Sequence, residues 1–358
     1  MRSLTSYART AGALGLAAGA VATGAALGLA AERYTVGRAL RRRAGDMDEP
    51  LGHIRGETRI VLTCDGVPLH VEVQGEPGAL PVTVVFCHGY ALNQDAWHYQ
   101  RRDLGDVGRL VFYDQRGHGR SGRGPKEHAN VDQLGDDLWA VLQDVAPDGP
   151  VVLVGHSMGG MTVMALADQR PELFGDRVVG VALISTSPGK LAEVTLGVPA
   201  AIGRAARRVA PGVVEVLSKR PNLVERGRRM GSDISYLLTK RYSFASDVPP
   251  ELVDFTAQMN AATPFEVVAE FFPAFDAHDK LAALHVLNGV ETLILAGEGD
   301  LMTPSDHSRD MLPAVPGAEL VIVPDAGHMV ILEHHELVNS HLRGLVHRAM
   351  RSSAGKCA

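Results

Sequence analysis

A serine between two glycines stands where the chain passes from an apolar run into a helical pattern. Gly155 and Gly159 lie two positions either side of Ser157. Residues 151–154 before them are apolar and mostly β-branched, as in a buried parallel strand, and residues 161–167 are typical of a helix packed on that strand. Glycines permit a sharp turn where no Cβ fits, and a helix N-terminus stabilises developing negative charge. We therefore predict that Ser157 is a nucleophile.

A serine hydroxyl needs a base to take its proton and a third group to orient that base. Two later segments supply candidates, because in each a polar residue follows an apolar run. Asp300 comes after residues 292–297, and His328 comes after residues 320–323. Both lie past the carboxyl ends of predicted parallel strands, where α/β sheets place their sites. We assign His328 as the general base and Asp300 as the acid that orients it.

The elements that must position these residues alternate between strands and helices. A hairpin is expected over residues 59–63 and 69–73, around a turn that contains Asp65 and Gly66. Further strands are expected at 82–87, 109–113, 151–155, 178–184, 292–297 and 320–323, with helices at 94–103, 131–145 and 158–169. This alternation predicts an α/β fold with a mostly parallel central sheet and helices on both faces.

The alternation is interrupted once, by helical runs without buried strands. We expect a helical insertion at 188–280 within a core made of residues 58–187 and 281–350. Before the core, residues 1–45 form an apolar segment with a basic flank, and residues 46–57 form a polar linker.

Together these segments resemble the α/β-hydrolase superfamily, in the lid-containing branch of serine hydrolases and esterases. The resemblance covers roughly residues 58–347. Besides the serine turn, residues 82–90 resemble the family's strand and His-Gly turn, and residues 112–121 resemble its D-x-R-G-x-G-x-S loop. The order serine, acid, histidine also matches. The Leu-Met-Thr-Pro sequence after Asp300 favours it over Glu298 as the acid.

The resemblance also implies roles for main-chain groups and for the insertion. The backbone N–H groups of Tyr90 and Met158 should form the oxyanion hole. The insertion should be a lid that roofs the site, selects the substrate and excludes water. We expect a structural role for the loop over residues 114–121, and we expect His156 to pack beside the nucleophile without reacting.

A serine at this turn narrows the chemistry. Haloalkane dehalogenases and epoxide hydrolases of this fold carry aspartate there, and residues 88–92 differ from the H-G-G-P-G of proline iminopeptidases. We expect a serine hydrolase that cleaves carboxylic esters or thioesters through an acyl-enzyme. The same triad leaves open perhydrolase or haloperoxidase-like activity, C–C bond hydrolysis and acyl transfer. A non-catalytic binding module of the same fold is the alternative from another class.

The insertion has an unusual composition. Between Arg204 and Arg241 it carries ten Lys or Arg against three acids, in a chain of formal net charge −6. One interpretation is a solvated helical surface, and the other is a face that attracts anionic lipid headgroups or an acidic substrate. Its later phenylalanines are Phe255, Phe265, Phe271, Phe272 and Phe275. Some of them are expected to line an apolar acyl pocket, while most aromatic residues of this kind belong to the core.

Residues 11–31 contain no charge and consist of ten Ala, five Gly, four Leu, one Val and one Thr. As a helix this segment would be about 31 Å long, enough to cross a hydrocarbon core. More arginines follow it, at residues 33–43, than precede it, which predicts a weak membrane anchor with the catalytic domain in the cytoplasm. Secretion with cleavage near residues 20–22, and a soluble cytoplasmic protein, stay open.

Composition and motifs limit the cofactors and partners that can be expected. The three cysteines, at 64, 87 and 357, have no zinc-site spacing, and no glycine-rich phosphate loop follows a first strand. We expect no cofactor and no metal. No motif supports nucleic-acid binding. The expected partners are a small ester or lipid substrate, and a membrane contacted through residues 11–31 and the basic part of the lid.

Overall fold

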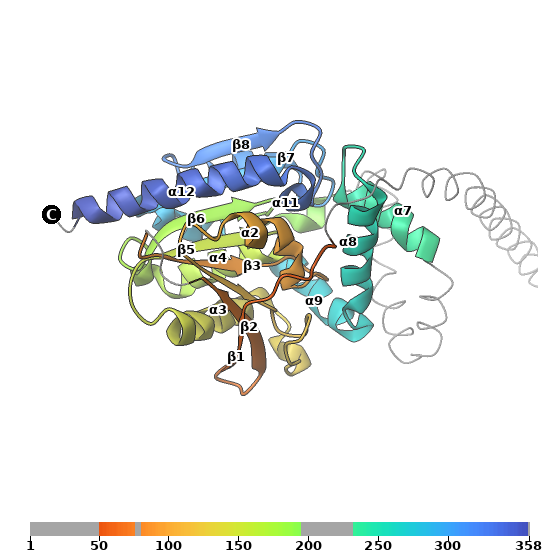
Figure 1. Cartoon of the computed structure of the whole chain (residues 1–358), viewed down its shortest axis with the longest axis horizontal. Coiled ribbons are helices and arrows are strands. Elements are labelled where there is room, and N and C mark those ends of the chain that lie inside the picture. Colours follow the sequence, from red (N-terminus) through yellow and green to blue (C-terminus); the bar gives the residue numbers. More distant parts are fainter. Residues whose placement is uncertain (1–49, 76–79, 195–231, 357–358) are drawn as a thin grey trace, which may run out of the picture. The chain divides into compact units, whose positions relative to one another are not determined.

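The computed structural model describes residues 50–75, 80–194 and 232–356. Within these residues, apolar runs form the strands of a single sheet. Its eight strands lie in the order β1-β2-β4-β3-β5-β6-β7-β8. They are β1 (Glu57–Leu62), β2 (Pro68–Gln74), β3 (Thr83–Cys87), β4 (Arg109–Tyr113), β5 (Val151–His156), β6 (Val178–Ile184), β7 (Glu291–Gly297) and β8 (Glu319–Val323). β2 pairs antiparallel with β1 and β4, and every other neighbouring pair is parallel. The predicted mostly parallel sheet is confirmed (Figure 1).

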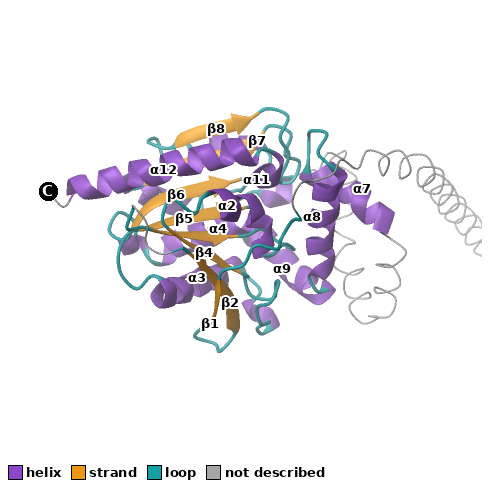
Figure 2. Cartoon of the chain, viewed as in Figure 1, coloured by secondary structure: helices purple, strands orange, loops and turns teal. Residues whose placement is uncertain are grey.

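Helices cover both faces of the sheet, as the fold class predicts (Figure 2). One layer contains α2 (His98–Asp103), α11 (Val330–Glu333) and α12 (His335–Lys356). The other contains α3 (Val131–Val145), α4 (Met158–Gln169) and α10 (Ser305–Met311). Since α4 begins directly after β5, the turn between them lies at the carboxyl edge of the sheet.

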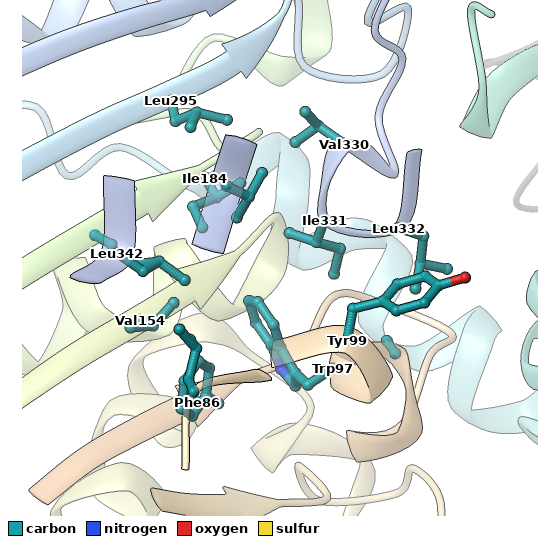
Figure 3. Packing of buried hydrophobic residues seen from close by; sticks show 14 of the residues in the cluster. Phe86, Trp97, Tyr99, Val154, Ile184, Leu295, Val330, Ile331, Leu332 and Leu342 are labelled. Carbon is teal, nitrogen blue, oxygen red and sulfur yellow. The ribbon is translucent and has the colours of Figure 1, made fainter. Parts of the chain in front are cut away.

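The two layers form because successive side chains of a strand point to opposite faces of the sheet. Val84 and Phe86 of β3 pack in the first layer, while Val85 and Cys87 pack in the second. Figure 3 shows the first layer, where side chains from the strands meet those of α11 and α12 around Trp97, which is fully buried. Apolar burial of this kind is the main stabilising contribution to such a core.

One predicted helix is divided in two. Residues 94–103 form a 3-10 turn (Gln94–Trp97) followed by α2. Side chains hold the first turn, because Asn93 accepts a hydrogen bond from the N–H of Asp95 and Asp114 accepts one from the N–H of Gln94. The predicted helices at 131–145 and 158–169 have the expected bounds.

Among the described residues, three further α-helices stand between β6 and β7 in the chain: α7 (Ser232–Ser243), α8 (Pro250–Ala262) and α9 (Phe265–Ala277). The chain leaves and rejoins the sheet side by side. Gly189 and Asp279 form an antiparallel bridge, and the N–H of Lys280 donates to the carbonyl of Pro188 at 2.7 Å. We call this pairing the neck of the insertion.

The predictions of membrane contact concern residues that lie mostly outside the described part of the chain. The segment 11–31 lies outside the described residues, as do all but Lys240 and Arg241 of the ten basic residues counted in the insertion. Among the described helices, none combines the length and the apolar character needed to cross a membrane. The anchor and the basic lid face therefore stay predictions from the sequence.

Candidate active site

Ser157 occupies the turn between β5 and α4 in a conformation that few side chains adopt. Its φ of 53° and ψ of −120° lie outside the favoured regions for an L-residue. The flanking glycines make this turn possible: a Cβ on Gly159 would collide with the carbonyl oxygen of Cys87, and one on Gly155 would overlap the backbone of Gly159. The turn places Ser157 at the N-terminus of α4, with 8% of its surface exposed.

His328 lies in the loop after β8 and is bonded to the predicted acid. Its Nδ1 is 2.8 Å from Oδ2 of Asp300, which lies past the end of β7. A carboxylate can only accept, so Nδ1 carries the proton and Nε2 keeps its lone pair. The rival acid Glu298 is exposed. The geometry therefore gives His328 the tautomer that a general base needs.

The carboxylate of Asp300 is fixed on both of its oxygens. Oδ1 accepts the backbone N–H groups of Met302 and Thr303 at 2.8 and 2.9 Å, and Oδ2 also accepts the Thr303 hydroxyl at 2.8 Å. Burial alone would raise the pKa of Asp300, but His328 and these hydrogen bonds outweigh it and hold the pKa below its ordinary value. Asp300 is thus an ionised, oriented acceptor at neutral pH.

The backbone around His328 is held by two further side chains. His156, next to the serine, lies with Nε2 2.9 Å from the carbonyl of His328 and donates to it. Glu333 accepts the N–H groups of Gly327, Ala245 and Ser246, which ties the histidine loop to the chain after α7. His156 is fully buried, as expected, and its hydrogen bond also positions the predicted base.

The peptide groups that carry the N–H of Tyr90 and of Met158 are both held through their carbonyl oxygens. Nδ1–H of His88 donates to the carbonyl of Gly89 at 2.7 Å, and the Thr186 hydroxyl donates to the carbonyl of Ser157 at 2.7 Å. In a trans peptide the C=O and N–H point in opposite directions. Fixing each carbonyl therefore fixes the direction of the N–H of the following residue.

The loop over residues 114–121 contacts both His88 and α4, next to the two peptide groups described above. Its Gln115 donates from its backbone N–H to Nε2 of His88, and its side chain accepts the hydroxyl of Thr162 in α4. Its Arg116 is buried and forms an ion pair with Asp137 of α3 at 2.6 Å. These contacts join the His-Gly turn to the helix that follows Ser157, as expected for a structural loop.

Ser157 and His328 line one cavity of about 370 Å³. Tyr90 and Leu92 line it from the core, and α7 and α8 line it with residues such as Tyr242 and Asn260. Among the described residues the Ser157 hydroxyl has no hydrogen-bond partner. Contacts of this kind often tighten only when substrate is bound.

The prediction that phenylalanines of the insertion line this cavity is wrong for the described structure. None of the five is among its lining residues. Phe271 packs instead in a buried cluster with Leu134 and Met158, and Phe275 stacks edge-on against Tyr90 at 4.9 Å. Their aromatic area is used to attach α9 to the core, which a phenylalanine pattern alone cannot distinguish from a pocket.

Two threonines and a set of polar residues at this site were not singled out from the sequence. Thr186 follows a buried strand at the carboxyl edge of the sheet, Thr303 follows the acid by three positions, and polar residues of α7 and α8 face the cavity. The position of Thr186 directly after a strand was an available signal. Within the described ranges, no three His, Cys, Asp or Glu side chains gather as a metal site would require.

The buried histidines make stability sensitive to acid. Burial lowers the pKa of His88 to about 4 and of His118 and His156 to about 3, from an ordinary value of 6.5. Below pH 6.5 these histidines bind protons in the unfolded chain but stay neutral in the folded chain. The free energy of unfolding therefore decreases as the pH falls. We expect unfolding at pH 5 to take up between about two and three protons, each worth about 1.4 kcal/mol per pH unit.

Chemical denaturation at pH 7, 6 and 5 checks this expectation through the slope of unfolding free energy against pH. Glu72 adds to the loss below its ordinary pKa of 4.5, since hydrogen bonds and Arg101 overcome burial and lower its pKa to about 2. A stability that stays constant from pH 7 to pH 5 would contradict the assignment of three neutral, buried histidines.

Comparison with known proteins agrees with this architecture. The family model described as alpha/beta hydrolase fold matches residues 82–335. The chain is 26% identical over 263 residues to AB hydrolase superfamily protein YisY of Bacillus subtilis (strain 168), covering 72% of this chain and 88% of the relative. It is 27% identical over 271 residues to sn-1-specific diacylglycerol lipase ABHD11 of Mus musculus, covering 74% and 80%.

Among solved structures, a thermophilic esterase from Thermogutta terrifontis superposes with a TM-score of 0.64 at 25% identity. The match covers 82% of this chain and all of that esterase. With a family model that matches well over half of its length, this chain belongs to the α/β-hydrolase fold family.

Proposed function

We propose that the protein is a serine hydrolase that cleaves carboxylic esters or thioesters with the triad Ser157, His328 and Asp300. The observation that carries the proposal is the hydrogen bond from His328 Nδ1 to Asp300, which leaves Nε2 free as a base in the cavity that also contains Ser157. The similarity to an esterase and to a diacylglycerol lipase supports an ester substrate.

The mechanism assigns each group one task. Nε2 of His328 takes the proton of Ser157 as Oγ attacks the substrate carbonyl, and the resulting imidazolium is stabilised by the Asp300 carboxylate. Collapse of the tetrahedral intermediate expels the alcohol or thiol, which takes the proton from His328. Water, deprotonated by His328, then attacks the acyl-enzyme and releases the acid, so Ser157 regains its proton.

The N–H groups of Tyr90 and Met158 are proposed to bind the oxyanion of both intermediates. Removing one such donor typically costs about 10²- to 10³-fold in kcat. These donors need no reorganisation, because His88 and Thr186 already fix their peptide planes. The insertion is proposed to act as the lid, since α7 and α8 line the cavity together with Ser157 and His328.

The test is hydrolysis of p-nitrophenyl esters with acyl chains of increasing length, together with labelling by a fluorophosphonate. We expect both turnover and labelling, with the chain-length optimum reporting the size of the cavity. A folded protein that neither turns over any ester nor takes the label would contradict the proposal and favour a binding role.

A prediction follows for Thr186. In Thr186→Val the hydroxyl that holds the Ser157 carbonyl is replaced by a methyl group of similar size, while the backbone N–H groups of Gly160 and Met161 still reach that carbonyl. We expect kcat to fall about tenfold with KM little changed, because only transition-state binding is weakened.

Steady-state kinetics on one p-nitrophenyl ester measures this split, and Thr186→Ser, which keeps the hydroxyl, should restore most of the activity. Equal kcat in the wild type and in Thr186→Val would show that the two backbone hydrogen bonds suffice to aim the Met158 N–H.

A further inference from the structure

The cavity at the candidate site has two chemically different walls. Leu92, Met302 and Met329 make the core side apolar apart from the reacting groups. The rest of the lining comes from α7 and α8 of the insertion and, apart from Leu238, consists of residues with hydroxyl or amide groups. These are Ser235, Thr239, Tyr242 and Ser243 of α7, with Thr256 and Asn260 of α8.

Helical spacing explains why these residues form a wall. Positions 235, 239 and 242 are three or four residues apart, as are 256 and 260, so each set lies on one face of its helix. Gln258, which lies between these two residues in the chain and on another face of α8, is exposed and does not line the cavity. The polar residues are thus concentrated on the faces turned toward Ser157.

Part of this wall has unused hydrogen-bonding capacity. Thr256 donates its hydroxyl to the carbonyl of Leu252 within its own helix. Among the described residues, in contrast, the side chains of Tyr242, Thr239 and Asn260 have no hydrogen-bond partner. Thr239 is 6% exposed, so its surroundings are those of an interior. A ligand without polar groups that fills the cavity would displace water from these side chains and leave them without hydrogen-bond partners. The loss of those hydrogen bonds would weaken binding.

The wall is also uncharged. No Asp, Glu, Lys or Arg is among the described residues that line the cavity. The nearest cations in the sequence of α7 are Lys240 and Arg241, and Lys240 pairs with Asp247 at 3.0 Å. Without a counter-charge on the wall, a charged ligand group would lose hydration with nothing to replace it. A neutral hydroxyl or amide group fits both observations.

We propose that the natural substrate is a small ester that carries an uncharged hydroxyl or amide group, and that Asn260 and Tyr242 bind this group. The inference rests on the proposed ester hydrolysis and specifies its substrate class. The cavity volume of about 370 Å³ lies at the lower end of the range of small-ligand sites. The polar group can belong to the acyl part or to the alcohol part, and the two arms of the experiment separate these sources.

The experiment compares esters that differ only by a methyl group in place of a hydroxyl. The acyl arm uses p-nitrophenyl 3-hydroxybutanoate against p-nitrophenyl 3-methylbutanoate. The alcohol arm uses 2-hydroxypropyl butanoate against 2-methylpropyl butanoate, followed by acid release in a pH-stat. We expect the full-length protein to prefer the hydroxyl ester about tenfold in kcat/KM in one arm, the scale of one neutral hydrogen bond gained in a partly enclosed site.

Asn260→Leu and Tyr242→Phe test the assignment to the wall. We expect either variant to reduce the hydroxyl-to-methyl preference in that arm several-fold. The matched control Gln258→Leu makes the same kind of change on the exposed face of α8 and should leave the preference unaltered.

Two results overturn the proposal by itself: hydrolysis of both members of each pair without preference, or a preference that neither variant reduces. Failure of the proposed function looks different, because then no ester of either arm is turned over and no fluorophosphonate label appears on the folded protein.

Discussion

Ser157→Ala is expected to lower kcat for ester hydrolysis by about 10⁴- to 10⁶-fold, the range typical of a lost serine nucleophile. Without Oγ there is no atom to form the acyl-enzyme, and the remaining groups can only bind substrate and polarise its carbonyl. Because the side chain is small and lacks a hydrogen-bond partner among the described residues, the change should leave the thermal stability close to that of the wild type. Removing Oγ should also abolish fluorophosphonate labelling.

The strained backbone of Ser157 supplies the control for this experiment. Ala keeps a Cβ and meets the same φ of 53°, so a loss of activity cannot be assigned to a changed turn. Burst kinetics with a p-nitrophenyl ester would show one equivalent of p-nitrophenol in the wild type if deacylation is slow. A variant that keeps a tenth of the wild-type activity would show that another residue is the nucleophile.

Asp300→Asn is expected to reduce kcat about 10³- to 10⁴-fold, as when a triad acid is neutralised. The structure dictates the orientation of the new amide. The backbone N–H groups of Met302 and Thr303 already donate to the Oδ1 position, so the amide oxygen stays there and the NH₂ takes the place of Oδ2. That NH₂ donates to Nδ1 of His328, which moves the ring proton to Nε2 and removes the base.

The matched control for this change is Glu298→Gln, which neutralises the neighbouring, exposed carboxylate two residues earlier. We expect it to keep kcat within about twofold, because exposed charges in water interact weakly. Measuring kcat for both variants, with thermal melts to check folding, decides between the two acids. A large loss in Glu298→Gln with little change in Asp300→Asn would reverse the assignment.

Local sequence patterns were sufficient to predict the regular helices and strands of the fold. The bounds of α3, α4 and β6 follow from helical patterns or a continuous apolar run that meet clear stops, such as the Asn130 cap of α3, whose side chain accepts the N–H of Gln133. The carboxyl ends of β5, β7 and β8 meet at one sheet edge, which is why residues more than a hundred positions apart could be assigned to one candidate site before any distance was known.

The rest depends on contacts that have no local pattern. Thr186 reaches the Ser157 carbonyl, and His156 reaches the His328 carbonyl, only because the sheet brings the ends of β5, β6 and β8 to the same edge. The polar face of α7 and α8 has the same spacing as an ordinary solvated face. Sequence alone therefore offers phenylalanines as the lining, although Phe271 and Phe275 pack against the described core.

The neck of the insertion has a consequence for how enzymes of this design change over time. Because Gly189 and Asp279 are paired, the segment between them starts and ends at nearly the same point in space. Lys280 fastens the returning chain to Asp132 and Asp168 on the core at 2.7 and 2.6 Å. Doubling the length of a loop whose ends are already joined costs only about 0.6 kcal/mol of closure entropy. The insertion can thus be lengthened, shortened or replaced during evolution while the reacting groups stay where the sheet holds them, so new substrate preferences can arise without rebuilding the chemistry.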